Sequence, residues 1–222
     1  MKEYSVQDFE YDEIRVIIFD FDGTLYQTPN YKAEYIRYLL GVIDDLSYSD
    51  SVKKNPLKYL EQYGFINDDE LPSFTENCEE FFSVYKPELD EYKLTHFYQP
   101  DYKNVITMSN EFLRKLQTQS HLVLVSNEVR ENIEYKAEKL GIDLSVFDNL
   151  YCPSVAFPKC HTKYEIYKKI VNNYLADGTE IYAVGDRYKV DIEPLLKLGG
   201  AGLLVDDPKE AEKYLSQKFE LN

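Results

Sequence analysis

The sequence predicts an α/β fold in which helices cover both faces of a parallel sheet, together with a second, small all-helical domain. Two observations lead to this prediction. Short apolar runs rich in β-branched residues alternate with helical patterns from residue 103 onward. The segment 27–102, in contrast, has helical patterns throughout and no convincing strand. The chain has 222 residues, which is long enough to bury a sizeable core.

Five short runs are expected to form the sheet. Each is 5–6 residues long, nearly all apolar inside, and followed or ended by polar residues. Such runs are typical of strands that are covered on both faces. The predicted strands are residues 15–20, 121–126, 149–153, 180–185 and 201–206.

Helical patterns lie between and after the later strands. One pattern ends at Gly141, a natural helix stop, and another begins at Thr162 with Glu165 three residues later, which is a capping signature. The predicted helices are residues 110–119, 129–140, 162–175, 192–198 and 208–216. Strands that alternate with helices indicate parallel pairing in an open sheet.

The segment between the first two strands is expected to be a separate helical domain. Thr28-Pro29 is a favourable helix start, and further helical patterns cover 51–63 and 76–85. We therefore predict a core made of residues 1–26 and 103–222, interrupted by a helical domain over 27–102.

Composition narrows the set of partners and locations. The formal net charge of −15 disfavours nucleic acid and anionic membrane surfaces, because both bind clustered Lys and Arg. No apolar run approaches the roughly 18–20 residues that cross a bilayer. Three cysteines, an odd and small number, fit a reducing cytoplasm. The oligomeric state stays open between a monomer and a homodimer.

Polar residues follow several predicted strands. Asp20 and Asp22 follow the first, Ser126 ends the second, and Asp186 and Asp191 follow the fourth. Because parallel strands bring their carboxyl ends to one edge, these side chains are expected to meet. Clustered carboxylates repel one another, so they require a cation, and oxygen ligands suit Mg²⁺. A hydroxyl and a lysine, either Lys159 or Lys163 near a helix start, could then hold a phosphoryl group.

This arrangement resembles the haloacid dehalogenase superfamily, the phosphohydrolases with an aspartate nucleophile. The first family motif stands here as Asp20-Phe21-Asp22-Gly23-Thr24, the second as Ser126, and the fourth as Gly185-Asp186 followed by Asp191. Many relatives carry the third motif as Lys-Pro, from which this chain departs. We prefer Lys163, at the helix start, to Lys159. The resemblance implies a Rossmann-like core with a helical cap over 27–102.

The resemblance also implies roles for these residues. Asp20 would attack phosphorus, and Asp22 would protonate the leaving oxygen and then activate water. Ser126 and the lysine would orient the transferring group. Magnesium would be held by Asp20, the backbone carbonyl of Asp22 and Asp186, with Asp191 as a further ligand or a supporting residue.

Four further residues are expected to contact substrate: Gly23, Thr24, Asn127 and Tyr26. The predicted activity is magnesium-dependent hydrolysis of a small phosphorylated metabolite through an aspartyl-phosphate. A phosphomutase of the β-phosphoglucomutase type and a non-catalytic phosphate-binding regulator of the same fold remain as alternatives. The motifs do not identify the substrate.

Overall fold

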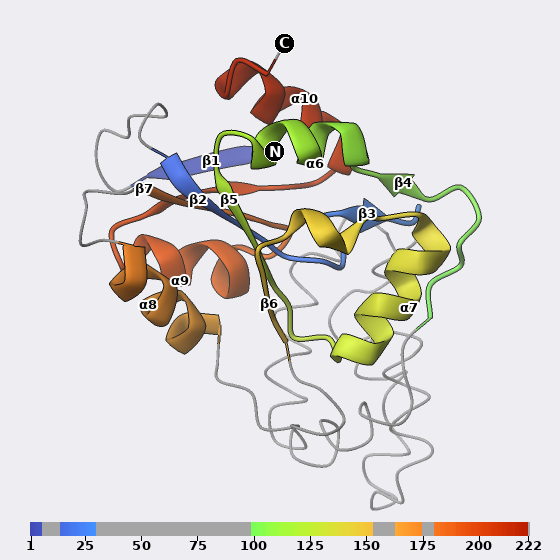
Figure 1. Cartoon of the computed structure of the whole chain (residues 1–222), viewed down its shortest axis with the longest axis horizontal. Coiled ribbons are helices and arrows are strands. Elements are labelled where there is room, and N and C mark those ends of the chain that lie inside the picture. Colours follow the sequence, from blue (N-terminus) through green and yellow to red (C-terminus); the bar gives the residue numbers. More distant parts are fainter. Residues whose placement is uncertain (6–13, 30–98, 153–162, 175–179, 222) are drawn as a thin grey trace, which may run out of the picture. The chain divides into compact units, whose positions relative to one another are not determined.

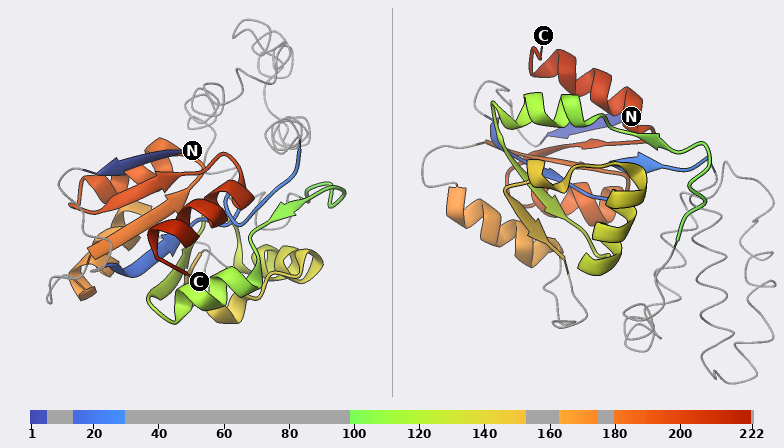
Figure 2. Two further views of the ribbon diagram at one scale, coloured as in Figure 1. Left: turned by 90° about the horizontal axis from the view of Figure 1, so that it is seen from above. Right: turned by 45° about the vertical axis from the view of Figure 1, so that its right-hand side comes forward.

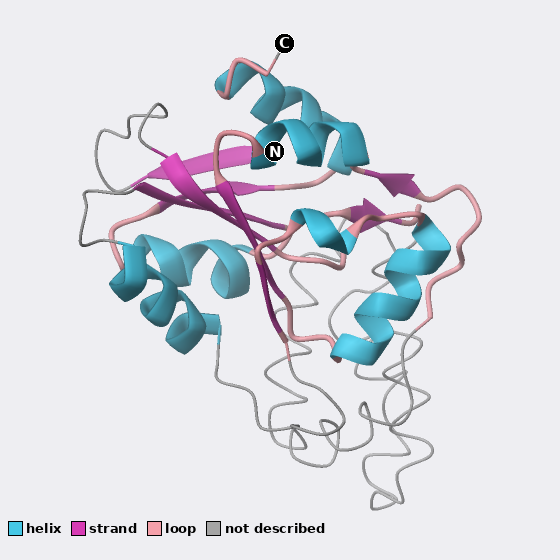
Figure 3. Ribbon diagram, viewed as in Figure 1, coloured by secondary structure: helices cyan, strands magenta, loops and turns pink. Residues whose placement is uncertain are grey.

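A six-stranded sheet forms the centre of the unit that holds residues 1–29 and 101–222 (Figures 1 and 3). The computed structural model describes residues 1–5, 14–29, 99–152, 163–174 and 180–221. In spatial order the strands are β1 (Lys2–Ser5), β8 (Ala201–Leu204), β7 (Glu180–Gly185), β2 (Ile14–Phe19), β5 (His121–Val125) and β6 (Asn149–Tyr151). Every pair is parallel except β1 with β8. The predicted α/β fold with a parallel sheet is confirmed.

The central strand β2 is buried on both faces. Ile17 and Phe19 belong to one apolar cluster, while Val16 and Ile18 belong to the other. All four side chains are fully buried. This alternation follows from the two-residue period of a strand, and it explains why β2 reads as a continuous apolar run.

Helices cover both faces of the sheet. The first apolar cluster includes residues of α6 (Asn110–Gln117), α7 (Arg130–Leu140) and α10 (Pro208–Lys218). The second includes residues of α8 (Lys163–Tyr174) and α9 (Glu193–Leu196). Two views show α6 and α10 on one side of the sheet and α8 with α9 on the other (Figures 1 and 2). No helix in the described ranges is long and apolar enough to span a bilayer.

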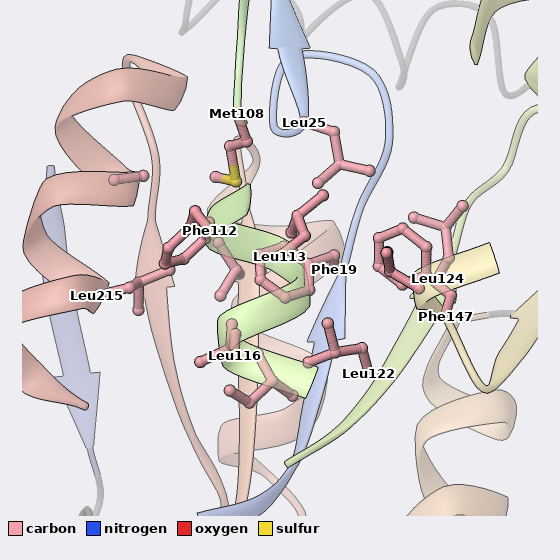
Figure 4. Packing of buried hydrophobic residues seen from close by; sticks show 14 of the residues in the cluster. Phe19, Leu25, Met108, Phe112, Leu113, Leu116, Leu122, Leu124, Phe147 and Leu215 are labelled. Atoms are coloured by element: carbon pink, nitrogen blue, oxygen red, sulfur yellow. The ribbon is translucent and has the colours of Figure 1, made fainter. Parts of the chain in front are cut away.

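The apolar side chains of α6, which recur at helical spacing in the sequence, pack on the sheet. Phe112, Leu113 and Leu116 share one side of α6 and pack toward Phe19 and Leu122 of the sheet (Figure 4). Ser109 caps this helix by accepting a hydrogen bond from the Phe112 amide at 3.2 Å. The cap and the apolar face together fix where α6 begins and how it lies on the sheet.

Two strand pairs were not predicted. β1 adds an antiparallel edge, with Lys2 opposite Leu204 and Ser5 opposite Ala201. A separate two-stranded ladder joins β3 (Tyr26–Gln27) to β4 (Ile106–Thr107). β1, β3 and β4 were missed because these strands are short and carry no apolar run of their own.

The chain divides into two compact units, residues 1–29 with 101–222 and residues 30–100. The second unit lies almost wholly outside the described residues. At the ends of segment 27–102, Gln27 belongs to β3 and residues 28–29 and 99–102 are not helical; the helical character expected of the rest stays a prediction. The sheet described above belongs to the first unit.

Candidate active site

The loop after β2 presents two carboxylates at the carboxyl edge of the sheet. The Asp20 amide donates to the Val184 carbonyl at 2.9 Å, which ties the loop to β7. Gly23 then adopts φ +76°, a backbone conformation that favours glycine. A Cβ at Gly23 would lie only 2.4 Å from Oδ2 of Asp186, so glycine also permits a close approach to that carboxylate.

A buried lysine links two of the predicted carboxylates. Lys163, the first residue of α8, donates through Nζ to Oδ1 of Asp20 and to Oδ1 of Asp191, both at 2.6 Å. The side-chain exposed fractions are 4% for Lys163, 6% for Asp20 and 0% for Asp191. The structure thus brings Lys163 to Asp20, whereas Lys159 lies outside the described residues. The choice between the two lysines stays a prediction.

Opposing effects act on the pKa values of Asp20 and Lys163, which lie beside Asp191. Burial raises the pKa of Asp20 above its ordinary value, Lys163 lowers it, and Asp191 raises it again. Burial alone would lower the pKa of Lys163, but attraction to Asp191 and Asp20 raises that pKa overall. Lys163 is therefore held as a cation beside the two carboxylates.

Three carboxylates converge where a cation could bind. Asp20, Asp186 and Asp191 each offer an oxygen, and these oxygens all lie within 4.8 Å of one another. An all-oxygen donor set of this kind suits Mg²⁺. Asp191 also uses Oδ2 to accept the Arg187 amide at 2.9 Å, so both of its oxygens already have protein partners. Asp191 is therefore better suited to hold Lys163 and the loop in place than to bind a metal ion directly.

Asp191 owes its place to an irregular helical turn. Residues Tyr188–Ile192 form a π-helical turn after β7, a feature that is frequent at functional sites. A Cβ at Gly185 would lie 2.3 Å from the Asp191 Cβ. Gly185 therefore allows the turn to fold back against the end of β7.

Asp22 lies in a different environment from Asp20. Its Oδ1 accepts hydrogen bonds from the Tyr26 hydroxyl and, at 2.7 Å, from Nζ of Lys136. Lys136 also donates to Oε2 of Glu128 at 3.2 Å. Burial would lower the pKa of Lys136, but Asp22 and Glu128 raise it overall. Two adjacent motif carboxylates are thus paired with two different buried lysines.

The sequence reasoning missed Lys136 and Glu128. A signal was present, because Lys136 lies on the same helical stripe as the buried residues Ile133 and Ala137. A lysine on an apolar stripe either reaches solvent or has a buried partner. Here the partner, Asp22, stands 114 residues earlier in the chain.

The remaining predicted site residues differ in how far they are buried. Phe19 is in register with Leu124, so Ser126 lies at the same sheet edge as Asp20; its buried hydroxyl accepts the Glu128 amide at 3.1 Å. Asn127 is exposed. Thr24 is fully buried, and its hydroxyl has no hydrogen-bond partner among the described residues.

Tyr26 is fully buried, and its hydroxyl contacts Asp22. The substrate contacts expected of Gly23, Thr24, Asn127 and Tyr26 stay predictions.

Solved structures with related folds give a first comparison. A haloacid dehalogenase-like family hydrolase from Xanthomonas campestris shares 15% identity over 94% of this chain and 93% of its own, with a TM-score of 0.50. A hydrolase from Streptococcus pneumoniae shares 17% identity over 92% and 99%, with a TM-score of 0.48. A HAD family enzyme from Bacteroides thetaiotaomicron, solved as a magnesium complex, shares 16% over 91% and 98%, with a TM-score of 0.47. At 15% identity, the likeness to the Xanthomonas campestris structure concerns the fold alone.

Sequence comparisons identify the family. A search of curated proteins found no match. The family model for haloacid dehalogenase-like hydrolases matches residues 14–199, which include both strand-end aspartates, Ser126, Lys163 and the loop after β7. With its motif carboxylates and Lys163 gathered at one sheet edge, the chain belongs to the haloacid dehalogenase-like hydrolase family.

Proposed function

We propose that the protein is a magnesium-dependent phosphatase that hydrolyses a small phosphorylated metabolite through an aspartyl-phosphate on Asp20. The observation that carries this proposal is the separation of the two motif carboxylates into distinct surroundings. Asp20 lies against Lys163 and the carboxylate cluster, while Asp22 lies against Tyr26 and Lys136. Neighbouring carboxylates in different environments are suited to different chemical roles.

In the first half-reaction, a carboxylate oxygen of Asp20 attacks phosphorus and the ester P–O bond breaks. Asp22 gives its proton to the departing oxygen, so the alcohol leaves neutral. Lys163 remains beside Asp20 as a cation, where it can neutralise charge on the phosphoryl oxygens. The Ser126 hydroxyl, at the same sheet edge, orients the group.

In the second half-reaction, Asp22, now ionised, takes a proton from water. The resulting hydroxide attacks the phosphorus of the aspartyl-phosphate, the P–O bond to Asp20 breaks, and inorganic phosphate leaves. Asp22 ends protonated, as at the start, so the cycle closes. In this scheme Asp22 carries both proton transfers, one to the leaving alcohol and one from water, while Asp20 carries the phosphoryl group.

The carboxylate cluster fits a divalent cation. Asp20 and Asp186, together with the backbone carbonyl of Asp22, would hold Mg²⁺, and Asp191 would orient Lys163 and the loop. When bound, Mg²⁺ supplies charge neutralisation for the phosphate oxygens. Three acids within 4.8 Å otherwise repel one another, which is the physical reason to expect a cation there.

Asp20→Asn tests the nucleophile. Release of p-nitrophenol from p-nitrophenyl phosphate in the presence of Mg²⁺ should fall by more than about 1,000-fold, because the amide cannot form the covalent intermediate. Circular dichroism should show an unchanged fold. Near-native turnover by the variant would contradict the assignment of Asp20.

EDTA and a substrate panel complete the test. Chelation should silence the wild-type enzyme, and added Mg²⁺ should restore it; full activity without divalent metal would refute the metal site. A panel of sugar phosphates, nucleotides and phosphoglycolate identifies the substrate class. Interconversion of sugar-phosphate isomers with little free phosphate would instead indicate a mutase, and absence of any turnover a regulator.

A further inference from the structure

A charged network behind Asp22 is distinct from the cluster around Asp20. Lys136 has no exposed side-chain surface, yet it is an ammonium ion, which is costly to bury without partners. Its partners are Asp22 at 2.7 Å and Glu128 at 3.2 Å, and each keeps 15% of its side-chain surface exposed. Among the described residues, the buried lysine therefore lies between two carboxylates that reach toward the surface.

The bonds to Asp22 converge on one oxygen. Both Lys136 and the Tyr26 hydroxyl donate to Oδ1. A carboxylate gripped at one oxygen by two donors is restrained against rotation about its terminal torsion, which is otherwise soft. In the proposed function, Oδ2 is then the oxygen of Asp22 that would give and take the proton.

Rigid elements hold the two donors. Lys136 stands on α7 between Ile133 and Ala137, both buried in the apolar cluster on that face of the sheet. The ring of Tyr26 is fully buried and meets Phe21 edge-on, with centroids 5.4 Å apart. Side chains fixed by packing in this way can hold a carboxylate within the narrow tolerance that proton transfer requires.

Glu128 connects this network to the Ser126 loop. Its amide donates to the Ser126 hydroxyl at 3.1 Å, its Oε1 accepts the Val129 amide at 2.8 Å, and its Oε2 accepts Lys136. Glu128 and Asp22 thus share the positive charge of Lys136, which Asp22 would otherwise neutralise alone. It also couples the placement of Ser126 to that of Asp22.

We propose that Lys136 is a positioning residue that aims the Asp22 carboxylate at the leaving-group oxygen, with Tyr26 and Glu128 completing the grip. This inference rests on the proposed phosphatase function. It assigns Lys136 a task different from that of Lys163, because Lys163 lies against the nucleophile Asp20 and Lys136 lies against the proton donor Asp22.

The test compares two substrates that need the proton to different extents. p-Nitrophenol departs readily as an anion, whereas phenol, a weaker acid, depends on protonation. Lys136→Met should lower kcat/KM for phenyl phosphate about tenfold more than for p-nitrophenyl phosphate, since well-placed general acids contribute about 10²–10⁴-fold. Lys139→Met, an exposed site on the same helix, is the matched control and should leave both values unchanged.

Two further variants test the proposal even if Lys136→Met does not fold. Tyr26→Phe removes one donor and keeps the ring, so it should show the same selectivity in smaller degree. Lys136→Met combined with Glu128→Gln removes an ammonium and a carboxylate together, so the buried charge stays closer to balance. It should fold and still discriminate against phenyl phosphate.

The outcomes separate this inference from the proposed function. Wild-type turnover that depends on Asp20 establishes the phosphatase on its own. Given that turnover, equal losses on both substrates in folded Lys136 and Tyr26 variants would overturn the positioning role and leave the phosphatase intact. A wild-type protein with no phosphatase activity would overturn both.

Discussion

At the scale of single residues, Asp20 and Asp22 show how one intervening position can separate two chemical environments. Asp20 directly follows the last residue of β2 and meets Lys163. Asp22 lies two residues later, in the turn, and meets Lys136. Gly23, which follows both carboxylates, has a left-handed backbone conformation, and its missing side chain leaves room for Asp186.

Gly23→Ala should therefore damage the site specifically. Its Cβ would lie 2.4 Å from Asp186, and a displacement of about 1 Å in that carboxylate can cost about 100-fold in rate. Steady-state kinetics with p-nitrophenyl phosphate, at several Mg²⁺ concentrations, would measure the loss. We expect both a lower kcat and a higher Mg²⁺ requirement.

Gly199→Ala is the matched control for this variant. Gly199 also has a positive φ, +88°, but nothing lies within 4 Å of where its Cβ would be. The left-handed backbone should cost both variants about 1 kcal/mol in unfolding free energy, and Gly23→Ala should lose more because its Cβ also meets Asp186. If both lost activity equally, strain alone would account for the effect and the contact with Asp186 would not matter.

At the scale of elements, Asp143 ties a short turn to α6. Its carboxylate accepts the Ser145 hydroxyl at 2.6 Å and the Ser145 amide at 3.0 Å, and it pairs with Arg114 at 2.7 Å. Hydrogen bonds from Ser145 and then from Arg114 lower the pKa of Asp143 to about 2. The ionised carboxylate therefore caps the 3₁₀ turn Leu144–Val146.

The stabilising contribution of Asp143 should depend on pH in a defined direction. Because the pKa is lower in the folded state, the contribution is complete above the ordinary value of 3.8 and is lost as the pH falls toward about 2. Asp143→Asn should cost at most about 1 kcal/mol at pH 7, since the group is near the surface. Urea unfolding should show a smaller difference from wild type at pH 3.

Asp207→Asn is the control for this experiment. Asp207 caps α10 by accepting the Lys209 amide at 2.7 Å and the Glu210 amide at 3.2 Å. Asn is about as good an N-cap as Asp, so this variant should be nearly neutral at pH 7. An Asp143→Asn penalty that did not shrink in acid would contradict the assigned role of the carboxylate charge.

The elements that the sequence predicted are those with a strong local period. β2, β5 and β7 are apolar runs, and α6 shows a clear buried face, so the parallel sheet followed from pattern alone. β1 could not be found in this way, because its four residues are exposed or half-buried and its pairing with β8 is non-local.

The same distinction between local pattern and non-local contact applies to the residues of the candidate site. Asp20, Asp22 and Asp186 were recognised from spacing along the chain, since motif residues at strand ends share one sheet edge. The contact between Lys136 and Asp22 depends on the rotation of α7 against the sheet. Periodicity identifies the buried stripe of a helix but not the partner that a polar residue finds there.

At the scale of the whole molecule, the acidic balance of −15 includes the cluster of Asp20, Asp186 and Asp191, whose negative charges a bound cation would neutralise further. A ligand that binds only the folded state at 100 times its Kd stabilises it by about 2.7 kcal/mol. For a chain of this size, each kcal/mol raises Tm by about 2–4 °C. Mg²⁺ should therefore raise Tm by several degrees.

Thermal unfolding in EDTA and in excess MgCl₂ would measure that shift without any assay of activity. NaCl at the same ionic strength is the control, because screening alone acts on all 40 acidic residues. Asp186→Asn should abolish most of the Mg²⁺-dependent rise. An equal rise in NaCl, or an undiminished rise in the variant, would contradict specific binding at the cluster.

The short β3–β4 ladder has a consequence for the stability of the unit that contains it. It pairs Tyr26 with Thr107 and Gln27 with Ile106, so the chain closes a stem before and after residues 30–100. The entropy of closing that loop grows only logarithmically, by about 0.6 kcal/mol for each doubling of its length. The folding free energy of the unit formed by residues 1–29 and 101–222 should thus change little with the length of the segment between the two strands.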